Sequence, residues 1–222
     1  MRLRAVAAVA ALGLLFSTAA SAQDDPATLI AQLEARLLAA RHIVIEATIE
    51  SRGVVVSKLK GRSELFDRNR ASWSYTGTFA GQPADFSLAS DGRALQMKSG
   101  GRAGEEPVGR ESNRALLIGL LRMGLLHNLA RLSGLAAPDH AQGGVEQWVQ
   151  LDSFRPTTFA VGGELEGMMA FGFDLVVAGT VSGSERLWLD PATGLPRRRQ
   201  LTVRFPQGNM TVIEDYTQFV VE

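Results

Sequence analysis

The 222-residue chain contains no cysteine. A protein without cysteine has no disulfide, no thiolate nucleophile, no thiolate metal ligand and no cysteine that could carry a lipid anchor after a leader segment. Its stability must therefore come from a hydrophobic core. With 45% apolar residues, a chain of this length can form such a core within one domain.

The chain also has no net charge, because 23 basic residues balance 23 acidic ones. Without Arg2 and Arg4 the counts become 21 and 23. Near-neutral charge argues against nucleic acid or an anionic membrane surface as the main partner. One cluster, Arg197 to Arg199, falls in an expected strand, whose alternate residues face opposite sides. We interpret this cluster as a solvated edge or face of a sheet.

Groups for catalysis are few. The three histidines, His42, His127 and His140, do not have the spacing of a metal site. The sequence has no H-E-x-x-H motif, no G-x-S-x-G elbow and no Walker loop, and Gly100 to Gly104 lacks the strand-then-helix context of a dinucleotide fingerprint. We therefore expect a protein that is not an enzyme and that has no catalytic residue, metal or cofactor.

Residues 1–22 have the order of a secretory signal peptide. Arg2 and Arg4 precede the apolar run AVAAVAALGLLF, and the small residues Ala20, Ser21 and Ala22 follow it. The apolar run is too short to span a membrane. Cleavage after Ala22 would leave residues 23–222 as a single exported domain, which we expect to be soluble and, from the style of the signal, periplasmic.

The most apolar segment beyond residue 22 runs from Ser112 to Leu135 and is predicted to be a helix. At helical spacing its leucines fall on three different sides, so the helix must be covered on more than one side. It is either a plain core helix or a cover over an apolar cavity, which Gly119 and Gly124 would allow to kink or shift. A membrane span is excluded because Arg122, which we expect nearer solvent, interrupts the run.

The rest of the chain predicts one amphipathic helix and a series of antiparallel strands. The first helix is expected at residues 26–40, and residues 99–111 and 137–144 are expected to be loops. Before the long helix, strands are expected at 42–50, 54–66, 71–78, around 86–88 and around 95–97. After it, strands are expected at 145–151, 154–161, 169–178, 185–189, 195–205 and 210–221.

Strand alternation also predicts which large side chains share a face. Trp73 and Tyr75 alternate with serine and threonine, and Phe171 and Phe173 alternate with small residues. Trp148 and Trp188 are weaker candidates, since the pattern does not say which face is concave. The residues expected to line a ligand site between the strands and the long helix are Trp73, Tyr75, Phe86, Leu88, Leu116, Leu120, Met123, Phe171 and Phe173.

These features together resemble the LolA/LppX/RseB-like superfamily of periplasmic proteins. The most specific part is LWLDPATGLP, from Leu187 to Pro196, and the resemblance extends over roughly residues 26–222. It implies an α+β fold in which a strongly curved antiparallel sheet forms an unclosed half-barrel with helices packed on its concave side. Some members of this superfamily carry lipoprotein acyl chains or glycolipids, and others sense them. No lid-closing or cargo-binding position of a known carrier can be mapped onto this chain.

Three hypotheses about function follow. In the first, the protein binds a lipid or a lipoprotein acyl chain between sheet and helices, as a periplasmic carrier would, because an apolar helix can fill the concave face when empty and be displaced by a ligand. In the second, it is an envelope protein-interaction or sensor domain that transports no ligand. In the third, the helix is only a structural core.

Overall fold

The computed structural model describes residues 25–132 and 145–222, and its main feature is one antiparallel sheet of eleven strands. The strand order is β6-β5-β4-β3-β2-β1-β11-β10-β9-β8-β7, so every neighbour except the pair β1 and β11 is also a neighbour in sequence. The strands are β1 (His42–Gly53), β2 (Ser57–Phe66), β3 (Arg70–Phe79), β4 (Gln82–Asp91), β5 (Ala94–Ser99), β6 (Arg102–Pro107), β7 (Val149–Phe159), β8 (Met169–Val177), β9 (Thr180–Leu189), β10 (Pro196–Phe205) and β11 (Gly208–Val221).

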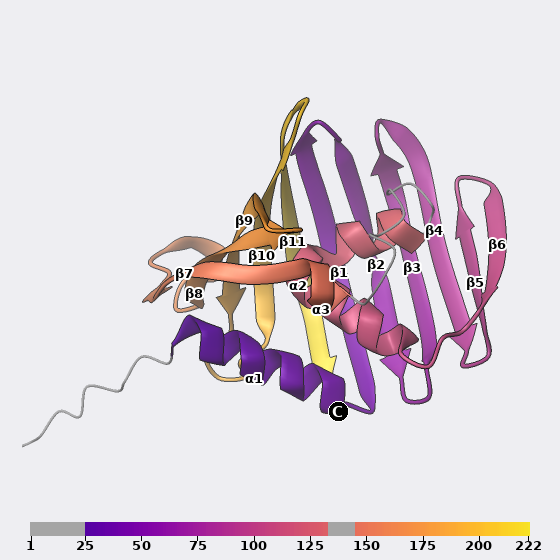
Figure 1. The fold of residues 1–222 in the computed structure, drawn as a ribbon, viewed down its shortest axis with the longest axis horizontal. Helices are drawn as coiled ribbons and strands as arrows, with labels where there is room; N and C mark the ends of the chain where they lie inside the picture. Colours follow the sequence, from indigo (N-terminus) through magenta and orange to yellow (C-terminus); the bar gives the residue numbers. More distant parts are fainter. Residues whose placement is uncertain (1–24, 133–144) are drawn as a thin grey trace, which may run out of the picture.

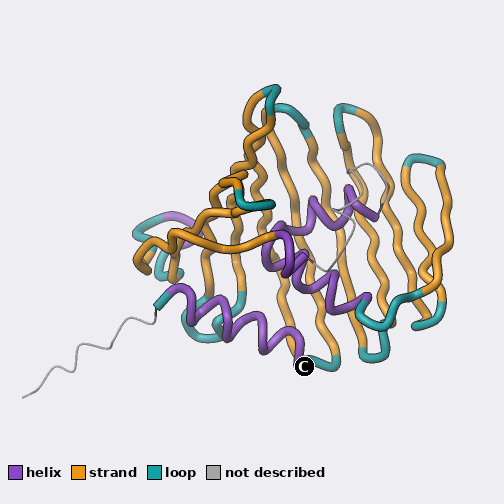
Figure 2. Tube along the Cα trace, viewed as in Figure 1, coloured by secondary structure: helices purple, strands orange, loops and turns teal. Residues whose placement is uncertain are grey.

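The sheet is curved and does not close. Strands β6 and β7 are its two edges, and the part formed by β7 to β9 curls toward the helices (Figure 1). The helices α1 (Pro26–Ala39), α2 (Ser112–Leu132) and α3 (Val145–Trp148) lie on one side of the sheet (Figure 2). The expected α+β half-barrel with helices on its concave side is therefore confirmed.

Strand alternation decides which side chains reach the helices. In β3, Ala71, Trp73 and Tyr75 are buried, whereas Ser72 and Ser74 are exposed. A strand that is buried on one face only must show this period of two. The pairing register carries the same buried face from β5 across the sheet to β8.

The first helix begins where the sequence provides a cap. The Asp25 carboxylate accepts a hydrogen bond from the Thr28 backbone N–H, and Pro26 takes the first helical position, where no N–H is needed. Leu29, Leu33 and Leu37 are buried against the core at helical spacing. This helix was predicted within a residue of its observed bounds.

Two local predictions need correction, and the kink that the glycines of the long helix were expected to allow is located. Residues 99–111 are not a loop, because β6 lies within them and pairs with β5. Residues 145–148 form the short helix α3 rather than strand, and β7 begins only at Val149. The long helix is not continuous, because Gly124 has φ 86° and ψ 173° and divides α2 into two arms. The expected signal peptide (1–22), the loop 137–144 and the last three residues of the expected long helix lie outside the described residues.

Candidate functional site

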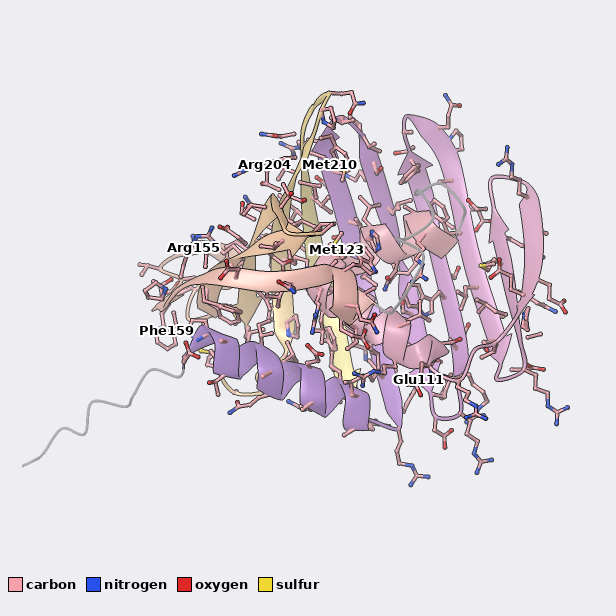
Figure 3. All side chains as sticks on the ribbon, in the orientation of Figure 1. Glu111, Met123, Arg155, Phe159, Arg204 and Met210 are labelled. Carbon is pink, nitrogen blue, oxygen red and sulfur yellow. The ribbon has the colours of Figure 1, made fainter. Side chains whose placement is uncertain are left out.

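All nine residues predicted to line a ligand site face the helices or belong to them. Eight are buried with at most 8% of their surface exposed, and Met123 is partly buried against the same core. Met123 lies near the middle of the molecule, in front of the sheet (Figure 3). The structure thus identifies the face carrying Trp73 and Phe171 as the concave one.

The nine residues do not form one cluster, however. Trp73 pairs with Leu88 and Tyr75 pairs with Phe86 across β3 and β4. Phe171 and Phe173 lie on β8, with five strands between β3 and β8 in the sheet. Phe173 packs against Phe154 of β7, and the centroids of the two rings are 5.6 Å apart. The concave face therefore has two separate aromatic regions, joined by the leucines of α2.

The second arm of α2, which we define as residues 125–132, covers the first of these regions. Its Leu129 lines a space of only about 10 Å³ together with Trp73, Phe86, Leu88 and Met97. This volume is about that of one water molecule, so the arm fills this part of the concave face. The apolar surface expected to receive a ligand is occupied here by the protein's own helix.

A buried pair of charged residues holds the break between the two arms. Arg199 Nη2 donates a hydrogen bond of 2.8 Å to the Leu121 carbonyl oxygen, near the end of the first arm, which comprises residues 112–123. Glu214 Oε1 accepts one of 3.0 Å from the Leu126 N–H, at the start of the second arm. A cation at a helix C-terminus and an anion at an N-terminus both match the helix dipole. Gly124 is required here, because a Cβ atom on it would lie 2.6 Å from Glu214 Oε1.

Glu185 is a third buried charged-type residue beside Arg199 and Glu214, and its pKa is shifted. Its Oε1 lies 3.3 Å from Arg199 Nε, and neither of its oxygens accepts a hydrogen bond from the described residues. Burial raises the pKa of Glu185 to about 8, against the attraction of Arg199 and with a smaller contribution from the nearby Glu214. One arginine thus faces two carboxyl groups, and Glu185 keeps its proton at neutral pH.

Two buried tyrosines, Tyr216 and Tyr75, also place polar groups on the concave face. Tyr216 donates a hydrogen bond of 2.6 Å to Glu214 Oε2, and burial raises the pKa of the Tyr216 phenol well above its usual range. The hydroxyl of Tyr75 lies 3.0 Å from Ser63 Oγ, and burial likewise raises the pKa of Tyr75. Both tyrosines stay neutral and act as hydrogen-bonding groups within the core.

Two expectations about arginines are wrong. Arg199, interpreted as part of a solvated cluster, is 1% exposed. Arg122, expected nearer solvent, is partly buried, where it donates a 2.8 Å hydrogen bond to the Val149 carbonyl and lies 3.3 Å from Glu34 of α1. Arg122 therefore ties α2 to α1 and β7.

The buried group of Arg199, Glu185 and Glu214 was not identified from the sequence, although the alternation of residues along the strands places all three on the buried face. Glu185 has the parity of Leu187 and Leu189, which places it on the apolar face of β9. Arg199 shares its parity with Leu201, and Glu214 with Val212. The charged residue types obscured a pattern that alternation alone would have revealed.

The described residues hold no group of three or more histidine, aspartate or glutamate side chains close enough to bind a metal ion. No helix among residues 25–132 and 145–222 has the length and apolar character needed to cross a membrane.

Comparison with known proteins finds similarity at the level of structure alone. No family model and no curated protein matches the chain. A LolA superfamily protein from Nitrosomonas europaea aligns with 10% identity and a TM-score of 0.44. The alignment covers 90% of this chain and 94% of that protein. MucB of Pseudomonas aeruginosa, in its complex with MucA, matches with 16% identity and a TM-score of 0.38.

The match to MucB includes 87% of this chain but only 57% of that one. A putative outer membrane lipoprotein-sorting protein domain from Vibrio parahaemolyticus has 12% identity, a TM-score of 0.32 and coverage of 87% and 91%. All three likenesses have TM-scores below 0.5 and identities of 16% or less.

Proposed function

We propose that the protein is an exported, non-catalytic binder of an apolar ligand, such as a lipid or a lipoprotein acyl chain. The ligand would lie on the concave face, where the second arm of α2 now packs. The observation that carries this proposal is the break at Gly124, which separates this arm from the rest of α2. A plain core helix has no need of such a break, since an unbroken helix keeps more backbone hydrogen bonds.

The surface under the arm suits an acyl chain. Trp73, Phe86, Leu88 and Met97 offer aromatic and aliphatic contacts, and Leu129 of the arm makes the contacts that a ligand would replace. Burial of one methylene contributes about 0.8 kcal/mol, so a chain of about a dozen carbons would compensate for the contacts that a displaced arm loses. The exchange therefore requires only that the ligand bury as much apolar surface as the arm does.

Locking the arm tests this proposal. The absence of native cysteine allows a pair, Leu129→Cys and Met97→Cys, to be joined by oxidation or by a short bifunctional thiol reagent. These two residues line the same small space, which brings the thiols within reach. We expect the joined form to take up a fluorescent fatty-acid analogue at least about tenfold more weakly than the reduced form, because binding requires the bound conformation to be populated.

A matched control joins two positions that should not move. Lys58 and Thr78 are directly paired on β2 and β3, on the face of the sheet away from the helices. Joining Lys58→Cys to Thr78→Cys should leave uptake unchanged. Equal uptake by the joined and reduced arm pair would contradict displacement of the arm. A folded wild-type protein that takes up no apolar probe would favour the envelope protein-interaction hypothesis.

The carrier role and the periplasmic location belong to the same proposal. The support for export is the order of charge, apolar run and small residues in 1–22. Mass spectrometry of lipids extracted from the protein purified from its native envelope would identify the ligand class.

A further inference from the structure

A second cavity opens at one end of the half-barrel, between the end of α1 and the start of α2. It has a volume of about 280 Å³. Its apolar part comes from four elements, α1, β1, β2 and α2, through the residues Leu38, Ala40, Ile43, Leu65, Phe66 and Leu117. Ile43, Leu65 and Leu117 also belong to the hydrophobic core, so the floor of this cleft is continuous with the interior under the helices.

The polar wall of the cleft is rich in arginine. Arg68, Arg110 and Arg114 line it, and Arg114 lies 3.4 Å from Glu146. Neither Arg68 nor Arg110 has a carboxylate within ion-pair distance in the described part of the chain. Asp67, the one acidic residue of the wall, is hydrogen-bonded by Arg70. The cleft therefore offers two arginines that form no ion pair, next to an apolar floor, although Arg68 also contributes at longer range to the lowered pKa of Asp67, whose main cause is the hydrogen bond from Arg70.

Hydrogen bonds hold these two arginines on adjoining segments. The turn between β2 and β3 has left-handed backbone at Arg68 (φ 58°) and Asn69 (φ 59°). Asn69 Nδ2 donates to the carbonyl oxygens of Gly109 and Arg110, at 3.3 and 2.9 Å, and Asn69 Oδ1 accepts from the Asn113 N–H. The turn and the segment that leads into α2 are thus tied together, so Arg68 and Arg110 stay near one another.

Several arginines on the outer face of the sheet contrast with this arrangement. Arg62 lies between Glu46 and Glu64, Arg155 pairs with Asp174, and Arg198 pairs with Asp215. The charges there are compensated within the protein. The positive charge at the cleft is available to a ligand instead.

We propose that this cleft binds the head group of an anionic lipid, one whose phosphate contacts Arg68 and Arg110 while its acyl chain enters over Leu65 and Leu117. This inference rests on the proposed function and adds the chemical class of the ligand. An uncharged apolar molecule would use the floor alone and gain nothing from the two arginines. A guanidinium is well suited to phosphate because its N–H groups match the phosphate oxygens in geometry.

The test compares short-chain phosphatidylglycerol with phosphatidylcholine of the same chain length, below their micelle concentrations, by calorimetry on the purified protein. We expect the anionic lipid to bind about five- to tenfold more tightly, as two charge-assisted contacts to exposed arginines allow. The preference should shrink as ionic strength rises from about 0.01 M to about 0.15 M, because the Debye length falls from about 30 to about 8 Å.

The informative variant is Arg68→Gln combined with Arg110→Gln. It should lose the preference, and its affinity for phosphatidylcholine should fall much less than its affinity for phosphatidylglycerol, because the choline ammonium offsets the charge of the same phosphate. The matched control, Arg197→Gln with Arg204→Gln, removes the same charge from exposed positions of β10. Arg204 lies in the upper part of the view, whereas Glu111, which directly precedes α2, lies in the lower part (Figure 3). This control should keep the preference, and inorganic phosphate alone should bind no more than weakly to either protein.

Equal affinities of the wild type for the two lipids would overturn the head-group site and leave the apolar binding function intact. If the Arg68→Gln, Arg110→Gln protein still prefers phosphatidylglycerol to phosphatidylcholine, the head-group site is also overturned, because the anionic head group would then bind somewhere else on the protein. Tight binding of inorganic phosphate alone would indicate a phosphate site rather than a lipid site. Failure of both lipids and of an uncharged apolar probe to bind would instead remove the proposed function itself.

Discussion

Arg199 and Glu214 are directly paired on neighbouring strands, and each binds one side of the same helix break. The arginine of β10 reaches the Leu121 carbonyl, and the glutamate of β11 reaches the Leu126 N–H. The sheet thereby supplies hydrogen bonds that a continuous α2 would make internally. The position of the second arm depends on these two side chains as well as on apolar packing.

Replacing Arg199 with methionine should destabilise the protein by about 3–5 kcal/mol, because it leaves the Glu214 carboxylate buried without a cation. Urea unfolding measures this loss. Adding Glu214→Gln should restore part of the stability, because the buried carboxylate is then replaced by a neutral amide whose oxygen can still accept the hydrogen bond from the Leu126 N–H. A loss below about 1 kcal/mol for Arg199→Met would contradict the role given to the cluster.

Glu185 should make stability depend on pH. Its pKa in the folded protein is about 8, above the value of 4.5 for an unperturbed glutamate. A raised pKa means that the folded state holds a proton which the unfolded state releases, so the contribution of Glu185 to stability falls as pH rises from about 4.5 to about 8. The Glu185→Gln variant should lack this loss and gain stability over the wild type by up to about 1 kcal/mol per pH unit.

Unfolding of both proteins by urea at pH about 5 and about 8 checks this prediction, because the two proteins differ only at Glu185. An advantage of the glutamine variant that is equal at both pH values would show that Glu185 does not titrate in this window.

Gly124→Ala should cost about 3 kcal/mol. Its φ of 86° and ψ of 173° lie in a region that side chains avoid, and the new Cβ would push against the Glu214 carboxylate. Gly163→Ala is the matched control, because Gly163 has φ 75° with nothing within 4 Å of the added Cβ. The control should cost about 1 kcal/mol. Similar losses in thermal unfolding would mean that contact with Glu214 adds nothing.

Export leads to a prediction about processing. Ala22→Asp should block cleavage, because the site accepts only small neutral side chains. Intact mass of the protein recovered from cells expressing the full chain measures it, with Gln23→Asp as a control beyond the site. Recovery of both variants at the processed mass would be evidence against cleavage after Ala22.

The sequence predicted most elements because burial on one face imposes a period on them. Trp73 and Tyr75 show the period of two, and the leucines of α1 show the helical spacing. Strand β6 escaped prediction because all six of its residues are exposed, so only backbone pairing with β5 makes it a strand. A four-residue helix such as α3 is too short to show any period.

The sequence predicted that the nine side chains of the expected ligand site turn toward the core, but not how they are arranged there. The six strand residues among them share one face of the sheet, as strand alternation required, yet alternation gives no information on how far apart two strands lie in the sheet. Gly124 was identified as a weak point of the helix, and the break is there. The residues that hold the break come from β10 and β11, and no local pattern links those strands to α2.

The most direct test of apolar binding on the concave face uses Trp73 as a reporter. The chain has three tryptophans, so Trp148→Phe with Trp188→Phe leaves Trp73 as the single emitter. Bromine quenches tryptophan fluorescence only near contact, and Trp73 lies directly beneath the second arm of α2. We predict saturable quenching of Trp73 by dibromostearic acid and none by stearic acid. Unchanged emission across the titration, in a protein that remains folded, would contradict the account.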